Sequence, residues 1–305
     1  MISIIFPIFN EEENLNELIS RVSLVANETS DYEFEFIFVD DHSTDKSQEI
    51  LRNIHQNDRR VKVIRFVRNF GGHAALTAGL NICSGDCAIV MAGDLQDPPE
   101  IINDLLEEWK KGSKIVWAVR SKRKGEKYST LFFSKLYYFL MNIFTDVTMP
   151  TLGTDVFLAD RRVIEANKQV KEKHSSIYMT FAWLGFNQAS IKYVKEVRHG
   201  GKSNWTLQKK VKLLLDSILS FSYHPIRIIS VLGFLIAFLG FVLSIVIFWR
   251  FYIGNPVEGW SSLMVVILVI GGVQMIMLGI LGEYLWRTFD EARNRPRYII
   301  DYTLD

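Results

Sequence analysis

Two long apolar segments near the C-terminus restrict how this chain can fold more than any other feature of its sequence. Residues 226–248 and 260–286 are almost entirely apolar, and each exceeds the roughly 20 residues that cross a bilayer as a helix. Tryptophan or tyrosine residues lie near the ends of both segments, as they do at membrane–water interfaces. We therefore predict a two-helix transmembrane anchor over residues 225–288, in preference to two buried helices of a soluble bundle.

Basic residues are distributed unevenly around these segments. The connection 251–259 contains no lysine or arginine, whereas basic residues are frequent before the first segment and after the second. The positive-inside rule then places both termini in the cytoplasm, with residues 289–305 as a cytoplasmic tail. We expect a multi-pass protein of the inner (plasma) membrane whose catalytic domain faces the cytoplasm.

The overall charge and the cysteines exclude other classes. Lysine and arginine number 35 against 34 aspartate and glutamate residues, so nothing in the net charge of +1 indicates a nucleic-acid partner. The two cysteines, Cys83 and Cys87, have no further cysteine or clustered histidine near them in the sequence. We interpret them as reduced thiols of the core rather than as a disulfide framework or a zinc site.

The region 1–205 alternates short apolar runs with amphipathic stretches and is predicted to form one cytoplasmic α/β domain. The apolar runs are β-branched and continuous, as in parallel strands that are covered on both faces. Strands separated by helices of this length indicate a doubly wound, mostly parallel sheet. Strands are predicted at 2–6, 34–39, 61–66, 87–91 and 115–119, and helices at 13–26, 45–57, 72–82 and 99–111.

Polar residues follow each of the five predicted strands. In a doubly wound sheet, ligands bind outside the carboxyl ends of the strands, so these residues are expected to form one site. In chain order they are Asn10 and Glu11, Asp40 and Asp41, Arg68 and Asn69, then Asp94, Gln96 and Asp97, and finally Arg120. Asp45 and Asp97 also fit a simpler role at the start of the following helix.

Residues 206–224, between the two predicted domains, repeat apolar side chains at helical spacing. Lys209, Lys210 and Lys212 lie away from that apolar stripe. The pattern favours an amphipathic helix in the membrane interface, with its lysines toward anionic headgroups. A helix packed on the catalytic domain is the alternative. The basic residues at 122–127 fit either a solvated run or a surface that recruits a lipid phosphate.

Three motifs in this order carry a family resemblance. Residues 7–12 (PIFNEE), 39–45 (VDDHSTD) and 93–100 (GDLQDPPE) resemble the successive motifs of the inverting glycosyltransferase family 2. Residues 68–79 are similar to the subgroup that glycosylates polyprenyl phosphates, which contains dolichol-phosphate mannose synthases and bactoprenol glucosyltransferases. The resemblance implies a GT-A type fold and a nucleotide-sugar donor. It also implies a divalent cation, Mg2+ or Mn2+.

The resemblance also implies roles for individual residues. The nucleotide would be bound by Pro7, Phe9, Glu11, Val39, Asp41, Ala92, Gly93 and Arg120, and the metal by Asp94 and Gln96. Asp155, Asp94 and Arg198 would be the catalytic group, and Arg198 and Lys202 would bind the acceptor phosphate. Asp155 would act either as a base or as a group that orients the attacking lipid phosphate.

Two positions depart from the family pattern. Ala92 replaces the first carboxylate of the D-x-D motif, which leaves Asp94, Gln96 and the diphosphate itself to hold the metal. Asn204 stands where the family's loop usually has a lysine, and Lys202 lies two positions earlier. We expect weaker metal binding, which does not preclude activity because Mg2+ often keeps few protein ligands.

The predicted reaction is transfer of glucose from UDP-glucose to undecaprenyl phosphate, which makes a lipid-linked sugar for cell-envelope glycans. UDP-N-acetylglucosamine, an aminosugar nucleotide and GDP-mannose remain alternative donors. Two membrane spans argue against a processive polysaccharide synthase, whereas Ala92 leaves open a catalytically inactive membrane scaffold. The pairs Gly271–Gly272 and Gly279–Gly282 allow close helix packing, so a homo-oligomer is possible.

Overall fold

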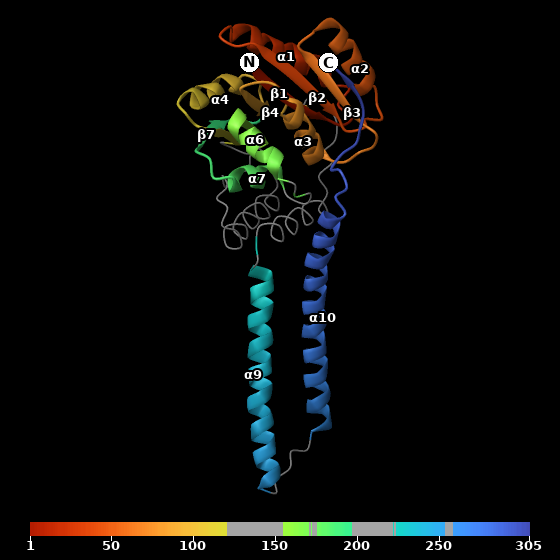
Figure 1. Ribbon diagram of the computed structural model, residues 1–305, viewed down its shortest axis with the longest axis vertical. Coiled ribbons are helices and arrows are strands. Elements are labelled where there is room, and N and C mark those ends of the chain that lie inside the picture. The colour runs from red at the N-terminus through yellow and green to blue at the C-terminus, as the bar shows by residue number, and fades with distance from the viewer. Residues whose placement is uncertain (121–154, 171, 173–175, 197–221, 223, 254–258) are drawn as a thin grey trace. The chain divides into compact units, whose positions relative to one another are not determined.

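A computed structural model describes residues 1–120, 155–170, 172, 176–196, 222, 224–253 and 259–305 of the chain. The described residues fall into two compact units. A globular unit contains the residues up to Glu196 together with the last segment, Pro296–Asp305, and a helical unit lies between them in the sequence. The C-terminus therefore belongs to the same unit as the N-terminus, as Figure 1 shows.

An eight-stranded sheet forms the centre of the globular unit, in the order β7-β5-β6-β4-β1-β2-β3-β8. The neighbours β4-β1-β2-β3 pair in parallel, as do β5 and β7, whereas β6 and β8 run antiparallel to their neighbours. The strands are β1 (Ile2–Ile8), β2 (Phe34–Asp40), β3 (Val61–Phe66), β4 (Cys87–Val90), β5 (Ile115–Arg120), β6 (Val156–Asp160), β7 (Gln188–Tyr193) and β8 (Ile300–Leu304).

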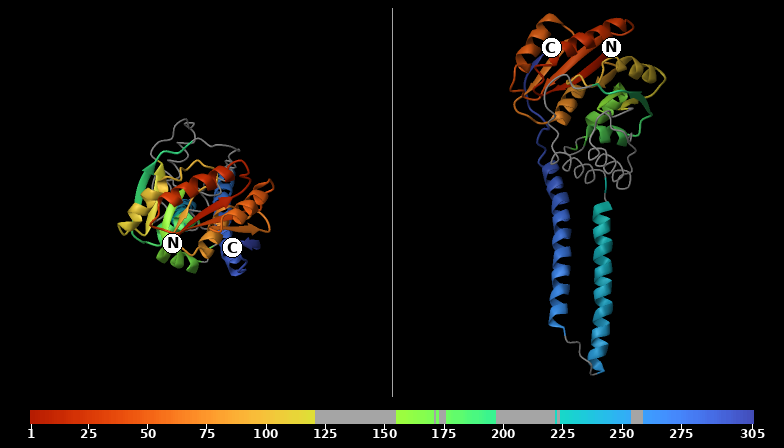
Figure 2. Two further views of the ribbon diagram at one scale, coloured as in Figure 1. Left: turned by 90° about the horizontal axis from the view of Figure 1, so that it is seen from above. Right: turned by 180° about the vertical axis from the view of Figure 1, so that it is seen from behind.

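Helices cover both faces of the sheet, so β2 is buried along its whole length and β1 at every residue except Pro7 (Figures 1 and 2). One core contains apolar side chains of α1 (Leu15–Glu28), α2 (Ser47–Asn57) and α4 (Ile101–Lys110). On the other side lie α3 (Gly72–Ile82), α6 (Arg161–Gln169) and α7 (Ile177–Trp183), which contact one another. Gly79 lets α3 approach β1 closely, because a Cβ there would lie 2.4 Å from Cγ2 of Ile5.

The fold class predicted from the sequence is confirmed in its architecture: a mostly parallel α/β sheet with helices on both faces. The sequence did not predict β6, β7 and β8. The residues of β7 and β8 are mostly partly or fully exposed, so neither strand has the continuous apolar run of a central strand. In the segment 289–305, which was predicted as a cytoplasmic tail, residues 300–304 form β8 and pair with β3.

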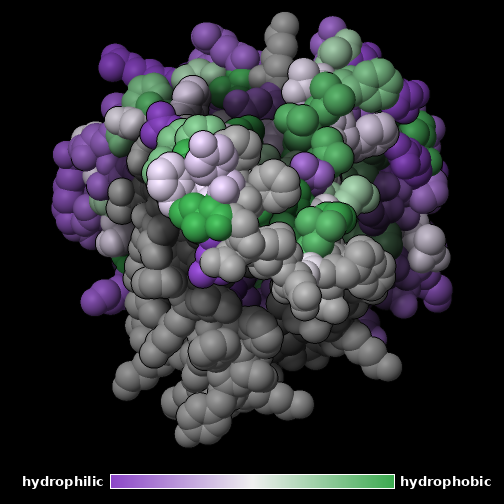
Figure 3. Space-filling model, turned by 90° about the horizontal axis from the view of Figure 1, so that it is seen from below, coloured by the Kyte–Doolittle hydropathy of each residue, from purple (hydrophilic) through white to green (hydrophobic). Residues whose placement is uncertain are grey.

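The helical unit contains α9 (His224–Tyr252) and α10 (Trp260–Ala292). Each includes a candidate membrane span, Ile226–Ile247 with a mean hydropathy of 2.7 and Val269–Ala292 with 1.5. Neither window is buried, and hydrophobic side chains lie exposed on the surface in Figure 3. Buried helices of a soluble bundle would not expose such side chains, so these helices suit a lipid environment.

The two helices of this unit pack against each other through Gly233 of α9 and Met277 of α10. A Cβ at Gly233 would lie 3.5 Å from the Met277 methyl carbon. At Gly271, Gly272, Gly279 and Gly282 a Cβ would meet no described atom within 4 Å. These glycines therefore do not serve the packing of α9 on α10 among the described residues, and their use in a homo-oligomer stays a prediction.

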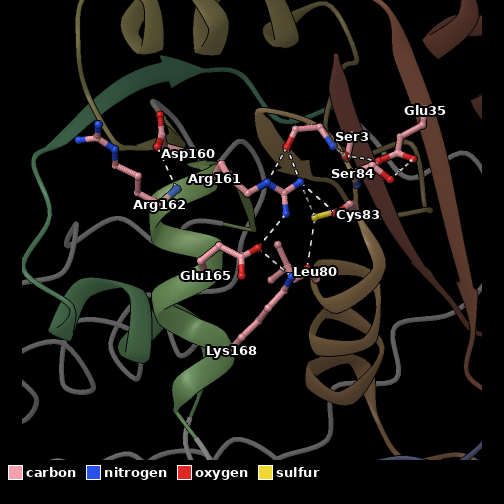
Figure 4. A network of polar contacts seen from close by, with 11 residues as sticks. Ser3, Glu35, Leu80, Cys83, Ser84, Asp160, Arg161, Arg162, Glu165 and Lys168 are labelled. Atoms are coloured by element: carbon pink, nitrogen blue, oxygen red, sulfur yellow. Dashed lines mark hydrogen bonds and ion pairs between the residues drawn. The ribbon is translucent and has the colours of Figure 1, made fainter.

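A polar network at the amino ends of β1 and β4 stabilises the side of the sheet opposite the predicted site (Figure 4). The Arg161 guanidinium donates to the carbonyl oxygens of Gly85 and Cys83, and Cys83 and Cys87 are buried free thiols. The buried Glu35 carboxylate accepts hydrogen bonds from the Ser3 hydroxyl at 2.5 Å and the Ser84 N–H at 2.6 Å.

Burial by itself would raise the pKa of Glu35. The hydrogen bonds from Ser3 and Ser84, together with Lys62 at 3.0 Å, outweigh burial and hold the pKa below its ordinary value. A carboxylate whose folded pKa is depressed stabilises the fold fully above its unfolded pKa. That stabilisation is lost as the pH falls through the folded pKa, hence below the ordinary glutamate pKa of 4.5.

We expect Glu35→Gln to lower the unfolding temperature of the purified full chain in detergent by about 2–10 °C at pH 7, because it leaves buried donors poorly paired. The difference from wild type should narrow as the pH falls below 4.5, which thermal unfolding at several pH values measures. Glu165→Gln, in the same network but 51% exposed, is the matched control and should change little. An unchanged unfolding temperature for Glu35→Gln at pH 7 would contradict this account.

Candidate active site

The loops that follow β1 and β2 are joined by hydrogen bonds between side chains and backbone. Asn10, at a positive φ of 57°, accepts at its Oδ1 from the Thr44 N–H at 2.8 Å. Its own N–H donates to Ser43 Oγ at 3.0 Å, and the Glu11 N–H donates to Ser47 Oγ at 3.0 Å. These contacts hold the two loops together as one wall at the carboxyl ends of neighbouring parallel strands.

Two of the aspartates in this wall are used for structure. Asp40 forms a buried ion pair with Arg65 and accepts from the Ser43 N–H at 2.8 Å. Asp45 accepts from the Glu12 N–H at 3.1 Å and from the Ser47 N–H at 3.0 Å, at the start of α2. The structure therefore supports the simpler role that the sequence allowed for Asp45.

Asp41 is buried beneath the loop that follows β3. Its two carboxylate oxygens accept from the N–H groups of Phe70 at 2.6 Å and Gly71 at 2.8 Å. Burial raises the pKa of Asp41, and the two backbone hydrogen bonds only partly offset this effect. Gly71 has φ +94°, a conformation that favours glycine, so the sequence at this position permits the turn around Asp41.

The loop after β4 approaches the first wall closely. A Cβ at Gly93 would lie 2.5 Å from Cδ1 of Ile8 and 3.9 Å from Cγ of Glu11, so Gly93 brings the two loops into contact. Leu95 has a positive φ of 56°, and Asp94 Oδ1 accepts from the Gln96 N–H at 3.2 Å. The predicted metal residues therefore lie on a tight turn next to the predicted nucleotide residues.

The donor set of this turn fits a hard divalent cation. Asp94 and Gln96 are both partly exposed and carry the oxygen ligands that Mg2+ and Mn2+ prefer. Within the described ranges there is no cluster of three or more His, Cys, Asp or Glu residues that could hold a metal ion without help.

A cluster of charges lies at the end of β5. Arg120, 13% exposed, forms an ion pair with Asp155, which directly precedes β6. Lys195, just after β7, contacts the same carboxylate at 3.0 Å. The Tyr178 hydroxyl donates to the Asp155 carbonyl oxygen at 3.3 Å. The structure therefore brings together Arg120 and Asp155, two residues that the sequence had placed in separate roles, and adds Lys195.

The β4–α4 loop is anchored to the end of β7. The Tyr193 hydroxyl donates to Asp97 Oδ1 at 2.5 Å, and the Glu196 N–H donates to the Gln96 carbonyl oxygen at 2.8 Å. Arg21 of α1 pairs with both Glu100 and Glu196, at 2.8 and 3.0 Å. Asp97 Oδ2 is buried without a hydrogen-bond partner among the described residues, and burial raises the pKa of Asp97.

Sequence reasoning missed Tyr193 and Lys195. The signal that would have found them is a polar residue following a strand, but β7 itself was not predicted. The remaining predicted residues differ in access: Pro7, Phe9, Ala92 and Arg120 are partly exposed, whereas Val39 is fully buried. Arg198, Lys202, the basic run at 122–127 and nearly all of the predicted interfacial helix at 206–224 lie outside the described residues.

Comparison with known proteins identifies the family. The chain belongs to glycosyl transferase family 2, whose model matches residues 3–168, and it is a glycosyltransferase. A second model, the GtrB C-terminal hairpin, matches residues 224–287. The family resemblance predicted from the sequence is thus confirmed.

The relatives match the chain over nearly its whole length. It is 36% identical over 300 residues to the SfII prophage-derived bactoprenol glucosyl transferase of Shigella flexneri, covering 98% of this chain and 97% of that one. It is 39% identical to the uncharacterized glycosyltransferase YkcC of Bacillus subtilis, covering 98% and 92%. Among solved structures, glucosyl-3-phosphoglycerate synthase from Mycobacterium tuberculosis is similar with a TM-score of 0.49 and 19% identity, covering 72% of this chain and 79% of that one.

Proposed function

We propose that this glycosyltransferase moves a sugar from a nucleotide donor to a polyprenyl phosphate, with glucose from UDP-glucose and undecaprenyl phosphate as the first pair. The observation that carries the proposal is similarity to bactoprenol glucosyl transferases over 98% of the chain, which includes the membrane hairpin as well as the catalytic domain. A relative that shared only the catalytic domain would support the donor half of the reaction alone.

The nucleoside is proposed to bind between the loops that follow β1, β2 and β3. Pro7 and Phe9 are partly exposed there and offer apolar contact to a base, while Glu11 accepts hydrogen bonds from ribose hydroxyls. Asp41 already accepts two backbone hydrogen bonds, and its carboxylate has further lone pairs for a base N–H. This pocket is supported by the hydrogen bonds that fix its walls.

The diphosphate is proposed to lie against the β4–α4 turn and the charges at the end of β5. Asp94 and Gln96 would hold the divalent cation, which would offset the negative charge on the leaving diphosphate. Gly93, against Ile8 and near Glu11, leaves room for the backbone to approach the donor. Arg120, at the end of β5, would add positive charge for the departing group.

The transfer is a single displacement. An ionised oxygen of the lipid phosphate attacks the anomeric carbon, a new C–O bond forms, and the bond from that carbon to the diphosphate oxygen breaks. The nucleoside diphosphate leaves with the electron pair, and the configuration at the anomeric carbon inverts. The attacking oxygen carries no proton at pH 7, so the step requires positioning more than a base.

Asp155 is proposed to orient the acceptor end of the site. Its carboxylate pairs with both Arg120 and Lys195, and two cations stabilise its ionised form. These cations are also available to a phosphate oxygen that enters the cluster. Arg198 and Lys202 are proposed as additional contacts to that phosphate, on the basis of the family pattern.

The membrane topology is proposed from the chain connectivity. Both segments that flank the helical unit belong to the globular unit. A hairpin of two spanning helices therefore returns the chain to the side from which it left. The lack of basic residues in the connection 251–259 supports a cytoplasmic position for the globular unit and both termini.

An inactive membrane scaffold is the second candidate, and a specific residue favours it. Ala92 removes one carboxylate from the motif that usually holds the metal. A protein of this kind would bind nucleotide without turning it over.

The test is product formation by the purified full chain in detergent with undecaprenyl phosphate and Mn2+ or Mg2+. Separate reactions contain UDP-glucose, UDP-N-acetylglucosamine or GDP-mannose. We expect one donor, with UDP-glucose the first candidate, to yield a sugar that partitions with the lipid. Nucleotide binding without product from any donor would favour the scaffold.

A further inference from the structure

The last ten residues, Pro296–Asp305, leave the helical unit and join the globular unit beside β3. We propose that Tyr298 of this segment is a positioning residue for the nucleotide pocket, because it supports the loop that binds Asp41. The inference rests on the proposed function, in which Asp41 contacts the base or ribose of the donor.

The first contact is between Tyr298 and Phe66, the last residue of β3. Their rings are stacked, with centroids 5.1 Å apart and an interplanar angle of 15°. The Asn81 side chain of α3 donates to the Tyr298 hydroxyl at 2.9 Å, and the Val67 N–H donates to the Ile299 carbonyl oxygen at 3.1 Å. Three independent contacts therefore hold this part of the C-terminal segment against the end of β3.

Phe66 in turn makes two contacts with residues that surround Asp41. Its ring meets Phe70 edge to face, with centroids 5.7 Å apart, and the Phe70 N–H donates to the Asp41 carboxylate. Its carbonyl oxygen lies 3.0 Å from Nδ1 of His42, the residue after Asp41. Phe66 therefore links Tyr298 to Phe70, in the loop above Asp41, and to His42, the residue after Asp41.

The pairing of β3 with β8 is irregular next to these contacts. The register between β3 and β8 shifts between Arg65 and Phe66, where Tyr302 pairs with Arg65 and Ile300 with Phe66. Asp301 is therefore the extra residue of β8. Bulges of this kind redirect side chains at the edge of a sheet. The register of β8 alone would not predict how Tyr298 lies on Phe66.

Tyr302 of the same segment provides a matched control. Its hydroxyl accepts from Gln48 at 3.2 Å and Arg52 at 3.4 Å, and the Arg52 guanidinium lies 5.0 Å from its ring centroid. Both partners belong to α2, and no described contact links Tyr302 to Phe66, Phe70 or Asp41. Loss of the Tyr302 side chain removes these contacts to α2 and leaves the ring contacts of Tyr298, Phe66 and Phe70 in place.

The experiment titrates the purified full chain in detergent with UDP and with GDP in the presence of Mn2+, by calorimetry. For the nucleotide that wild type binds, we expect Tyr298→Ala to raise Kd about three- to tenfold, since an aromatic pair that positions the loop is lost. Tyr298→Phe keeps the ring stack and should stay within about twofold of wild type, as should Tyr302→Ala. Thermal unfolding of each variant shows whether the fold is retained.

Three results would overturn the inference. The first is an unchanged Kd for folded Tyr298→Ala, and the second is an equal rise in Kd for Tyr302→Ala, which would mean only that β8 stabilises the sheet. The third is wild-type protein that binds neither nucleotide, which would overturn the proposed function itself and the inference with it. The first two outcomes leave the proposed function intact, so the two failures are distinguishable.

Discussion

Replacing Asp94 by Asn is expected to lower kcat by at least about a hundredfold, because a metal ligand contributes several kcal/mol to stabilising the leaving diphosphate. The effect should be large in this chain in particular, since Ala92 leaves Asp94 as the single carboxylate of the D-x-D motif. Asparagine has nearly the same shape as aspartate, and its amide oxygen can still accept the hydrogen bond from the Gln96 N–H. Initial rates with saturating donor and a series of Mn2+ concentrations measure the change.

Ala92→Asp is the complementary variant. It restores the missing first carboxylate of the D-x-D motif and is expected to lower the Mn2+ concentration for half-maximal activity, with little change in kcat at saturating metal. Ala92 is partly exposed, so the added carboxylate is not forced into the core. Asp94→Asn with full activity at all metal concentrations would show that the cation, if needed, is held elsewhere.

The second large effect is expected at Asp155. Asp155→Asn should lower kcat about ten- to a hundredfold, because a carboxylate that fixes Arg120 and Lys195 is lost and the acceptor phosphate is then poorly positioned. The loss should appear mainly in kcat and in the KM for the lipid, while the Kd for the nucleotide changes little. Initial rates with varied lipid concentration separate these quantities.

Asp160→Asn is the matched control for Asp155. Asp160 lies at the other end of the same strand and accepts from Lys114 and from the Trp109 indole, each at 2.8 Å. The Asp160→Asn variant should unfold at a lower temperature than wild type and keep the wild-type kcat. A loss greater than about a thousandfold in Asp155→Asn would instead indicate general-base catalysis. An unchanged kcat in Asp155→Asn would show that Asp155 has no role in the reaction.

The part of the fold that local pattern encodes was predicted closely. β3 and α3 occur at the residues predicted for them, Val61–Phe66 and Gly72–Ile82. A central parallel strand must be apolar along its length, and α3 begins at the second of two consecutive glycines, so both elements leave a clear local pattern. The rule that ligands bind at the carboxyl ends of the strands also predicted that Glu11, Asp41 and Asp94 lie at the same edge of the sheet, after β1, β2 and β4.

What the sequence could not supply is contact between distant residues. Tyr193 and Asp97 are 96 residues apart, Lys195 and Asp155 are 40 apart, and Tyr298 lies far from Phe66 in the sequence. Such pairs depend on which strands are neighbours, and an edge strand such as β8 has too little buried surface to be recognised from its pattern. The direction of the Asp41 carboxylate, toward the backbone of the β3–α3 loop, is equally a product of tertiary structure.

The measurement that tests the central claim most directly is the mass of the lipid product. Wild-type protein is incubated in detergent with UDP-glucose, Mn2+ and undecaprenyl phosphate, and the organic extract is analysed by mass spectrometry beside an Asp94→Asn control. The account predicts a species heavier than the lipid phosphate by one hexose residue, absent from the control and absent without lipid. Release of nucleoside diphosphate with no glycosylated lipid, from this or any other donor, would contradict it.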